Sequence, residues 1–454
     1  MNDSVTSGLD YANDNIGKLF RKIFFPTLWG MIFNALITII DGVFVGRGVG
    51  SDGIAAVNII APIYMVATGI GLMLGIGASV TAGMALAKGD RRKTDAIVSQ
   101  SFLSVTVFML ILISTVLCLP EKVVMFMGSS YHLLPYAIDY LIWIAPATLF
   151  VAWSSIGMMV IRLDGSPKYA MLINIIPAIL NIVGDYILIF PFNMGIKGAA
   201  VATMGSVAIG GIMAVAYFSF SYFIKLRADL NSMWQHLRRV LAIGSSAFVT
   251  EIAMSVMMLT GNYIFMRDFG DAGVAAYSIA CYLFPLIFMM SNAVAQSAQP
   301  IMSYNAGIRQ EARVTEAFRV SKHVALCCGM LIATCIALAS KDIVSLFIPV
   351  NSSAGILAAK GLPIFSTCAV FFSLNIAYIG FCQSLGRATQ AIVYTLLRGI
   401  VVLIPMFFLM SSLFPSWGVW GAITVSEVLT FLIIIMTLRP RKILGSITYN
   451  DNGR

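Results

Sequence analysis

The stretch Gly50-Ser-Asp-Gly-Ile-Ala-Ala-Val-Asn-Ile59 recurs 220 residues later as Gly270-Asp-Ala-Gly-Val-Ala-Ala-Tyr-Ser-Ile279. Two further pairs of short motifs keep nearly the same spacing: Leu163-Asp-Gly165 with Ser384-Leu-Gly386 at an offset of 221, and Gly195-Ile-Lys-Gly-Ala-Ala with Gly418-Val-Trp-Gly-Ala-Ile at an offset of 223. Three matches in register predict that the chain contains two copies of one structural unit.

The sequence around these motifs is strongly apolar. Of the 454 residues, 59% are hydrophobic and 11% are charged. An ordinary soluble domain carries roughly 25% charged residues. A membrane-spanning helix needs roughly 20 apolar residues, so a chain of this length has room for about a dozen spans. This composition excludes a soluble enzyme, a disordered chain and a disulfide scaffold.

The apolar runs between charge and turn clusters predict an all-α polytopic membrane protein with 12 transmembrane helices. Their approximate bounds are 23–46, 54–86, 97–119, 137–161, 169–190, 198–224, 240–266, 274–303, 323–347, 355–384, 390–413 and 417–438. The repeat divides these spans into two pseudo-symmetric six-helix bundles. Both bundles start on the same side of the membrane, so they are parallel repeats, an arrangement typical of alternating-access transporters.

The distribution of positive charge predicts the topology. With a cytoplasmic N-terminus, 22 of the 29 Lys and Arg residues fall in the termini and the even-numbered loops, six fall on the opposite side, and Arg398 lies inside a span. This asymmetry places both termini in the cytoplasm. The expected organisation is a cytoplasmic segment 1–22, a first lobe 23–224, a cytoplasmic linker 225–239, a second lobe 240–438 and a cytoplasmic tail 439–454.

Four acidic residues lie deep in apolar runs, namely Asp41, Asp185, Glu251 and Glu427. An acid at the centre of a span costs about 2.5–3.5 kcal/mol on insertion scales, so each position requires a reason. One reason is an ion or proton site. The other is a neutral side chain that is hydrogen-bonded where two helices pack.

Polar residues of the first lobe recur at helical spacing around two of these acids. They are Asn34 and Asp41 on the first span, Asn174, Asn181 and Asp185 on the fifth, and Thr203 near the start of the sixth. Residues seven or eleven apart share one face of a helix. Pro177 removes a backbone donor and is expected to kink the fifth span, which would leave a carbonyl free to face a cavity. Carboxylate, amide and hydroxyl oxygens together favour a proton or monovalent-cation site, and a polar helix–helix seam is the alternative.

The second lobe lacks this constellation, because Asp41 aligns with Gly261 at the repeat offset. Glu251 on the seventh span is a separate acid, and Met254 and Met258 follow it on the same helix. Flexible, polarizable Met side chains suit a pocket that accepts many shapes, so these three residues are a candidate second-lobe cation or substrate site.

Two other residues of the second lobe carry opposite charges inside spans. We expect Arg398 of the eleventh span and Glu427 of the twelfth to form a structural ion pair.

No pattern in the sequence indicates catalysis. The three His residues, His132, His236 and His323, are far apart, so no metal site is predicted beyond a possible Na⁺. There is no Walker A motif, no clustered nucleophile and base, and no basic patch with interleaved aromatic residues. We therefore expect neither an enzyme nor a nucleic-acid-binding protein, and no cofactor other than H⁺ or Na⁺ as coupling ion.

From about residue 18 to residue 440 the chain resembles the multidrug and toxic compound extrusion (MATE) family of secondary transporters. The motifs that carry the resemblance are Pro26 followed by Asp41-Gly-Val-Phe-Val-Gly46, Gly53-Ile-Ala-Ala56, Gly198-Ala-Ala-Val-Ala-Thr203 and Gly418-Val-Trp-Gly-Ala422. The resemblance implies two bundles arranged as a V and export of cationic lipophilic compounds against inward flow of protons or sodium ions. It also implies that Asp41, Asn181, Asp185 and Thr203 bind the coupling ion.

The resemblance adds two further expectations. Pro26 matches a proline that is associated with bending of the first helix. Glu251 resembles a seventh-helix acid of a sodium-coupled branch, although the tenth span, Gly361–Leu385, contains no acid that would complete that branch's site.

These inferences combine into a multidrug antiporter of the bacterial inner (plasma) membrane that works by alternating access. Its partners are small cationic drugs and the lipid bilayer, and a monomer suffices because both lobes lie in one chain. A lipid-linked oligosaccharide flippase of similar two-lobed architecture is the nearest alternative. A flippase needs a strongly cationic cavity for pyrophosphate, whereas this chain buries four acids and only Arg398. A passive channel is the other alternative, and flux that saturates and depends on a counter-gradient distinguishes a carrier from it.

Overall fold

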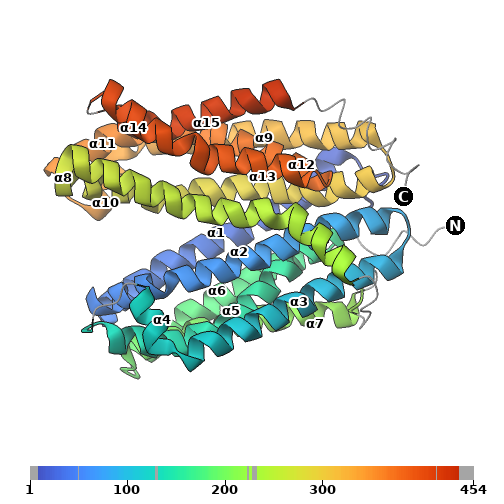
Figure 1. The fold of residues 1–454 in the computed structure, drawn as a ribbon, viewed down its shortest axis with the longest axis horizontal. Coiled ribbons are helices and arrows are strands. Elements are labelled where there is room, and N and C mark those ends of the chain that lie inside the picture. The colour runs from blue at the N-terminus through green and yellow to red at the C-terminus, as the bar shows by residue number, and fades with distance from the viewer. Residues whose placement is uncertain are drawn as a thin grey trace. The chain divides into compact units, whose positions relative to one another are not determined.

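The structure is a computed structural model that describes residues 9–49, 51–127, 131–221, 224–226, 233–415 and 417–438. Within the helices, a few side chains lie outside this description, among them those of residues 34–39. The described residues form helices joined by short connections, and no strand occurs among them (Figure 1).

The described residues of the first half of the chain form seven helices. They are α1 (Ile16–Gly48), α2 (Ser51–Ala87), α3 (Arg91–Cys118), α4 (Pro120–Phe126), α5 (Leu134–Leu163), α6 (Pro167–Ile189) and α7 (Gly195–Phe220). Pro residues begin α4 and α6, where the absent N–H has no helical partner in any case. Helix α5 lies against α2 and α7, and α6 lies against α7.

The second half follows the same order. Its elements are α8 (Met233–Gly307), α9 (Glu311–Leu338), α10 (Ser340–Phe347), α11 (Ser353–Ser366), α12 (Cys368–Ser384), α13 (Ala388–Leu396), the π-helical turn η1 (Leu397–Val401), α14 (Leu403–Leu413) and α15 (Gly418–Thr437). Helix α8 contains two spans, because Gly270 adopts φ 63° and ψ −152° and interrupts the helix. A residue with a Cβ rarely adopts this backbone conformation, so glycine is required there.

The number of membrane helices agrees with the sequence. Among the described residues, eleven helical segments are long and apolar enough to cross a bilayer. Helix α1 has 33 residues, about 50 Å at 1.5 Å per residue, and supplies the twelfth span. The middle of α3 exposes apolar side chains at neighbouring positions, such as Val107, Phe108 and Ile111, which suits contact with lipid. The predicted fold, an all-α polytopic protein of 12 helices in two bundles, is confirmed.

The internal repeat is visible in the backbone. Gly89 and Arg309, at an offset of 220, both have positive φ, 77° and 59°, immediately before the third span of each copy. Gly165 and Gly386, at an offset of 221, have φ 86° and 69° after the fourth span of each copy. The short helices α4 and α10 also occupy equivalent places. Helix α4 lies outside the predicted spans, whereas α10 is a separate helix within the predicted ninth span 323–347.

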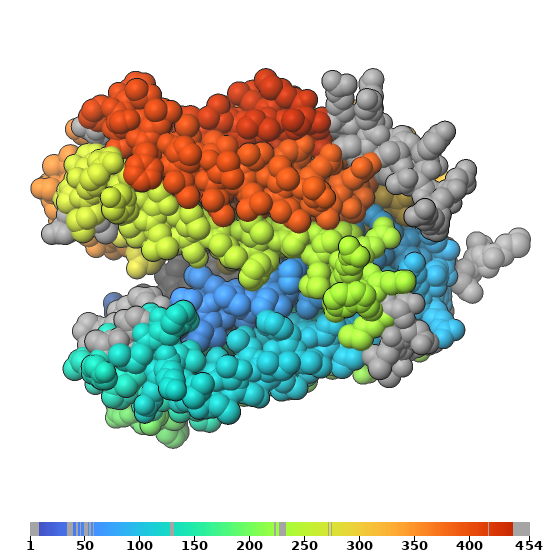
Figure 2. Space-filling model, viewed as in Figure 1, coloured from blue at the N-terminus to red at the C-terminus, as the bar shows by residue number. Residues whose placement is uncertain are grey.

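The chain divides into two compact units. The first comprises Arg21–Phe248 and the chain up to Asp14, and the second comprises Val249 onward together with Asn15–Phe20. Each unit has its own apolar core, around Phe102, Ile156 and Val160 in the first and around Phe365, Phe372 and Trp420 in the second. In the space-filling view the side chains of α13–α15 form a continuous surface of the second unit, as those of α3 and α4 do in the first (Figure 2).

Several boundaries differ in detail from the sequence-based expectations. Helix α1 starts at Ile16, within the predicted N-terminal segment, and α8 starts at Met233, within the predicted linker. The predicted tenth span is interrupted at Thr367 and the eleventh contains a π-helical turn. The predicted tail 439–454 and linker residues 227–232 lie outside the described residues, so the lobe, linker and tail assignments stay predictions.

Candidate ion-coupling and substrate sites

The carboxyl groups of Asp41 on α1 and Asp185 on α6 face each other within hydrogen-bonding reach in the first unit. Asp185 is completely buried, and neither of its oxygens receives a hydrogen bond from a described donor. The same holds for Oδ1 of Asp41. Two carboxylates held together away from water repel each other unless a proton or a cation lies between them. The pair therefore has the chemistry of a site for a proton or a small cation.

Close packing of α6 on α7 brings an amide and a hydroxyl beside this pair. A Cβ on Gly184 would lie 3.0 Å from the Ala202 side chain, and one on Gly198 would lie 3.0 Å from the Leu188 carbonyl, so small residues permit the close approach. At this contact Asn181 Nδ2 donates to Thr203 Oγ1 at 3.3 Å. The structure thus places together Asp41, Asn181, Asp185 and Thr203, the four residues that the sequence analysis grouped.

Two tyrosines complete the surroundings of the pair, and sequence reasoning missed both. Tyr140 of α5 is buried, interacts electrostatically with both carboxyl groups and hydrogen-bonds to Thr203. Tyr64 of α2 lies close enough to interact with Asp41. Neither residue stands out in the sequence, because a single Tyr within an apolar run is read as a large hydrophobic side chain. Only the packing of α2 and α5 brings them to the carboxyl groups.

Asn174 and Asn34, the other polar residues that the sequence analysis grouped with the two acids, lie outside this contact. Asn174 donates to Met158 Sδ at 2.9 Å and lies against Gly30 of α1, where an added Cβ would be 3.2 Å from Asn174 Nδ2. Asn174 therefore helps to pack α1, α5 and α6 together. The side chain of Asn34 lies outside the described residues.

The two prolines have distinct settings. Pro26 is half-buried inside α1, which continues as one helix from Ile16 to Gly48. Pro177 packs against Gly210 of α7, where an added Cβ would lie 2.8 Å from its ring and 3.2 Å from the Ile173 carbonyl. Ile173 is four residues before Pro177, so its carbonyl is the one that lacks a helical donor. The expectation that this carbonyl faces a cavity is wrong, because it faces Gly210, which has no side chain to exclude it.

The candidate residues of the second unit are not joined into a site. Glu251 on α8 is half-buried and has no hydrogen bond or ion pair among the described residues. Met254 and Met258 are half-buried and pack against the apolar core of the second unit. A role for these three residues in binding a cation or a drug stays a prediction.

The ion pair predicted between the eleventh and twelfth spans is present. Arg398, in the π-helical turn, donates to Glu427 Oε1 from Nη2 at 2.9 Å and from Nε at 3.2 Å. Asn375 Nδ2 donates to Glu427 Oε2 at 2.7 Å, and the guanidinium lies 4.0 Å from the centre of the Phe372 ring. Both charged side chains are almost fully buried. The charge of Arg398 is thus neutralised within the protein.

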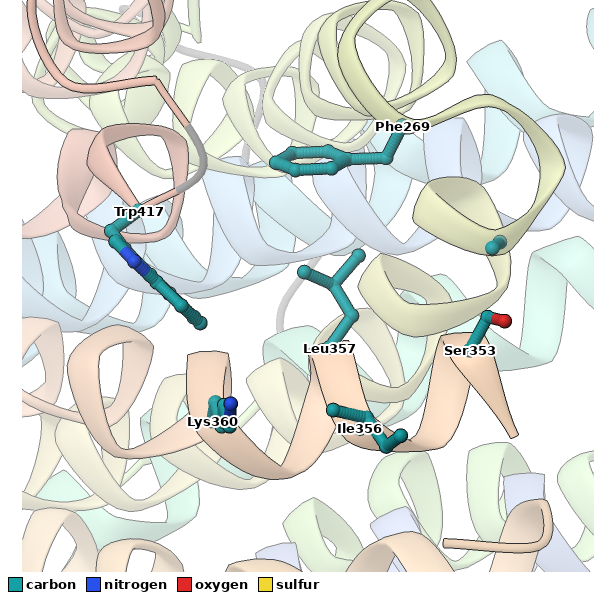
Figure 3. A pocket seen from close by; sticks show the side chains of 7 residues that line it. Phe269, Ser353, Ile356, Leu357, Lys360 and Trp417 are labelled. Atoms are coloured by element: carbon teal, nitrogen blue, oxygen red, sulfur yellow. The ribbon is translucent and has the colours of Figure 1, made fainter. Parts of the chain in front are cut away.

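A shallow cavity of about 320 Å³ lies in the second unit, away from these residues. Its lining comprises Phe269, Ala272, Ser353, Ile356, Leu357, Lys360 and Trp417 (Figure 3). The Lys360 ammonium lies 5.9 Å from the centre of the Trp417 ring. None of the predicted site residues lines this cavity. Among the described residues, no group of three or more His, Cys, Asp or Glu side chains is arranged to hold a metal ion.

Comparison with known proteins identifies the family. The sequence model of the MatE family matches residues 26–187 and 246–409, one segment in each half of the chain. The multidrug export protein MepA of Staphylococcus haemolyticus is 26% identical over 444 residues, 95% of this chain and 96% of that protein. MepA of Staphylococcus aureus strain MRSA252 is 25% identical with the same coverage.

Solved structures show the same fold. An outward-facing multidrug resistance MATE family transporter of the MOP superfamily superimposes with a TM-score of 0.90 over 98% of this chain and 99% of its own, at 19% sequence identity. The two segments that the family model matches correspond to the two copies of the helix order in this chain. The chain belongs to the MatE family, and it is a membrane transporter, not an enzyme.

Proposed function

We propose that this protein is a multidrug efflux antiporter that exports lipophilic cations in exchange for protons or sodium ions. The observation that carries the proposal is the facing pair Asp41 and Asp185, in which Asp185 is fully buried and both of its oxygens and Oδ1 of Asp41 receive no described hydrogen bond. The MepA relatives are multidrug export proteins, which supports drug export as the transport function.

The proposed mechanism follows from the charge of the site. When the carboxyl pair holds no proton or cation, its negative charge favours a cationic drug within the same unit. Arrival of a proton or Na⁺ from outside neutralises the pair, removes the attraction and allows α1 to repack on α6. Coupling requires only that the ion and the drug favour different conformations of the protein. Pro26 would serve as the point where α1 bends, since a proline leaves one helical hydrogen bond unmade.

The setting of the protein follows from the sequence. We propose a location in the bacterial plasma membrane with both termini in the cytoplasm, because Lys and Arg are concentrated on that side. A monomer suffices, since one chain contains both units. A flippase of pyrophosphate-linked sugars is disfavoured, because Glu427 already neutralises the buried Arg398.

The test uses purified protein in liposomes that contain a pH-sensitive dye. A lipophilic cation such as ethidium is added under an imposed proton gradient, and the experiment is repeated with a sodium gradient. Collapse of the proton gradient that depends on the drug, and that is lost in Asp41→Asn and Asp185→Asn, would support proton antiport through the first unit. The matched control is Asp139→Asn, which removes one acid of an exposed pair with Lys197 at 3.3 Å in the same unit.

The experiment with a sodium gradient distinguishes coupling through the first unit from coupling through the second. A response to sodium alone that is lost in Glu251→Gln would move the coupling site to the second unit and contradict the main assignment. A response to neither gradient would contradict antiport altogether.

A further inference from the structure

Two buried acids that belong to neither candidate site lie where the first unit continues into the connection to α8. Asp164 directly follows α5 and is 5% exposed, and Asp95 lies in the first turns of α3 and is 4% exposed. A buried carboxylate is costly unless hydrogen bonds compensate it, so its partners show what it holds in place.

Asp164 holds the end of α7. Its Oδ2 accepts hydrogen bonds from the Tyr217 hydroxyl and from Ser221 Oγ, both at 2.6 Å. Ser221 terminates α7 with an extended backbone conformation, and its Oγ accepts from the backbone N–H of Ile224 at 3.2 Å. A continuous chain of hydrogen bonds therefore runs from Asp164 through Ser221 to the connection.

Asp95 holds the next residue of the connection. Its Oδ1 accepts from the backbone N–H of Lys225 at 2.9 Å. Between these two anchors the side chain of Ile224 is fully buried in the core of the first unit, with Ile97 and Val98 of α3. Two acids and one apolar side chain thus fix the chain at Ser221, Ile224 and Lys225, which we call the linker clamp.

The second copy of the repeat lacks both acids. The paired positive-φ positions set the register, and they align Asp164 with Leu385 and Asp95 with Thr315. Thr315 is exposed, and its hydroxyl donates to the Glu311 carbonyl of its own helix. The acids are therefore not needed to build the repeated fold. They occur in the copy whose end leads into another copy of the repeat in this chain.

We propose that Asp95 and Asp164 are positioning residues for transport, which fasten the chain that enters α8 to the first unit, so that α8, which continues from the first unit into the second, transmits movement of one unit to the other. The inference rests on the alternating-access part of the proposed function. A loose start of α8 would let this helix shift against the first unit, so each conformational change would move the second unit less reliably. The expected defect is in the rate of turnover, not in drug binding.

The contacts define variants that separate this role from general damage. Asp95 serves as an acceptor for an N–H group, so Asp95→Asn keeps an acceptor oxygen whereas Asp95→Ala removes it. Asp164→Asn likewise keeps an oxygen for Tyr217 and Ser221, and Asp164→Ala does not. Lys225 contributes its backbone, so Lys225→Ala is a matched control, and Thr315→Ala is the control at the equivalent position of the repeat.

The first measurement is amide hydrogen exchange over residues 221–226 in the full-length protein in detergent or nanodiscs. Asp95→Ala and Asp164→Ala should accelerate exchange there at least tenfold, whereas both Asn variants and both controls should stay within about threefold of the parent. The melting temperature of each variant verifies that it is folded. If this segment keeps its protection in the Ala variants, the acids do not hold the connection and the proposal is wrong.

The second measurement reports on the two units. Spin labels are placed at Lys197→Cys and Lys360→Cys, one exposed position in each unit, in a chain whose seven natural cysteines are replaced. The Ala variants should broaden the distribution of label distances and lower the maximal drug flux at least fivefold while KM changes less than twofold. The Asn variants should restore both.

The outcomes distinguish failure of the proposed clamp from failure of the proposed antiport. Faster exchange with an unchanged distance distribution and unchanged flux would overturn the clamp's role. A parent protein without gradient-driven drug flux would contradict the proposed antiport, and the distance distributions would still decide whether the clamp couples the units.

Discussion

Asp41 and Asp185 lie 144 positions apart in the sequence, yet their carboxyl groups face each other between α1 and α6 of the first unit. Asp185 is fully buried and has no described hydrogen-bond donor. This relationship gives the first unit a place where one proton or one small cation changes the balance of charge, and most of the functional predictions derive from it.

Replacement of either acid should abolish coupled export. Asp41→Asn and Asp185→Asn each remove the charge that an ion must neutralise, so drug flux driven by a gradient should fall at least tenfold. Flux is measured in liposomes at equal protein content. Asp139→Asn should retain more than half of the parent flux, because that acid lies in an exposed pair with Lys197. Full coupled flux in the Asp185→Asn variant would contradict the site.

Tyr140→Phe tests the residue that the structure adds to the site. Loss of its hydroxyl removes a hydrogen bond to Thr203 and a polar group near both carboxyl groups. We expect a several-fold loss of flux together with a shift of the pH at which flux is half-maximal. Tyr136→Phe, one helical turn earlier on α5 and partly exposed, is the control and should leave that pH unchanged. A parent-like pH profile for Tyr140→Phe would exclude the hydroxyl from the site.

The buried pair Arg398 and Glu427 should matter for stability more than for coupling. Glu427→Ala leaves a buried guanidinium unpaired, and breaking a buried pair from one side costs about 3–5 kcal/mol. The melting temperature in detergent should therefore fall clearly. The double variant Arg398→Met with Glu427→Leu should be more stable than Glu427→Ala, because no charge is left unpaired. A double variant that is the least stable of the series would show that the pair is itself strongly stabilising.

The linker clamp should respond to pH. Burial, together with the nearby Asp95, raises the pKa of Asp164 from 3.8 to about 6, against the opposing effect of the Tyr217 and Ser221 hydroxyls. Tyr11 also interacts electrostatically with Asp164. A raised pKa means that the folded protein favours the protonated acid, so this contribution to stability is complete below about pH 4 and is lost as pH rises through about 6.

This pH dependence is measured as the change in melting temperature between pH 5 and pH 7.5. The parent protein should lose a few degrees more over this interval than Asp164→Asn, which cannot ionise. Thr315→Ala should follow the parent. Equal losses in the parent and in Asp164→Asn would show that Asp164 does not titrate in this range.

The sequence by itself determined the features that depend on local composition. Apolar runs of sufficient length specify membrane helices wherever they occur, because the bilayer requires each span to satisfy its own backbone hydrogen bonds. The duplicated motifs predicted the two-bundle architecture. The isolated acids at positions 41 and 185 indicated a candidate ion site in the first half. The spacing of Asn181 and Asp185 along α6 was also readable, since residues four apart share a helix face.

Only the tertiary structure decided which faces meet. Hydropathy does not encode how a helix is rotated about its axis against its neighbours. The approach of Tyr140 to Thr203 and the orientation of the Ile173 carbonyl toward Gly210 therefore follow from packing alone. The linker clamp joins Asp95 to a backbone N–H 130 residues later. A backbone donor carries no side-chain signature, and for that reason no sequence pattern could have revealed it.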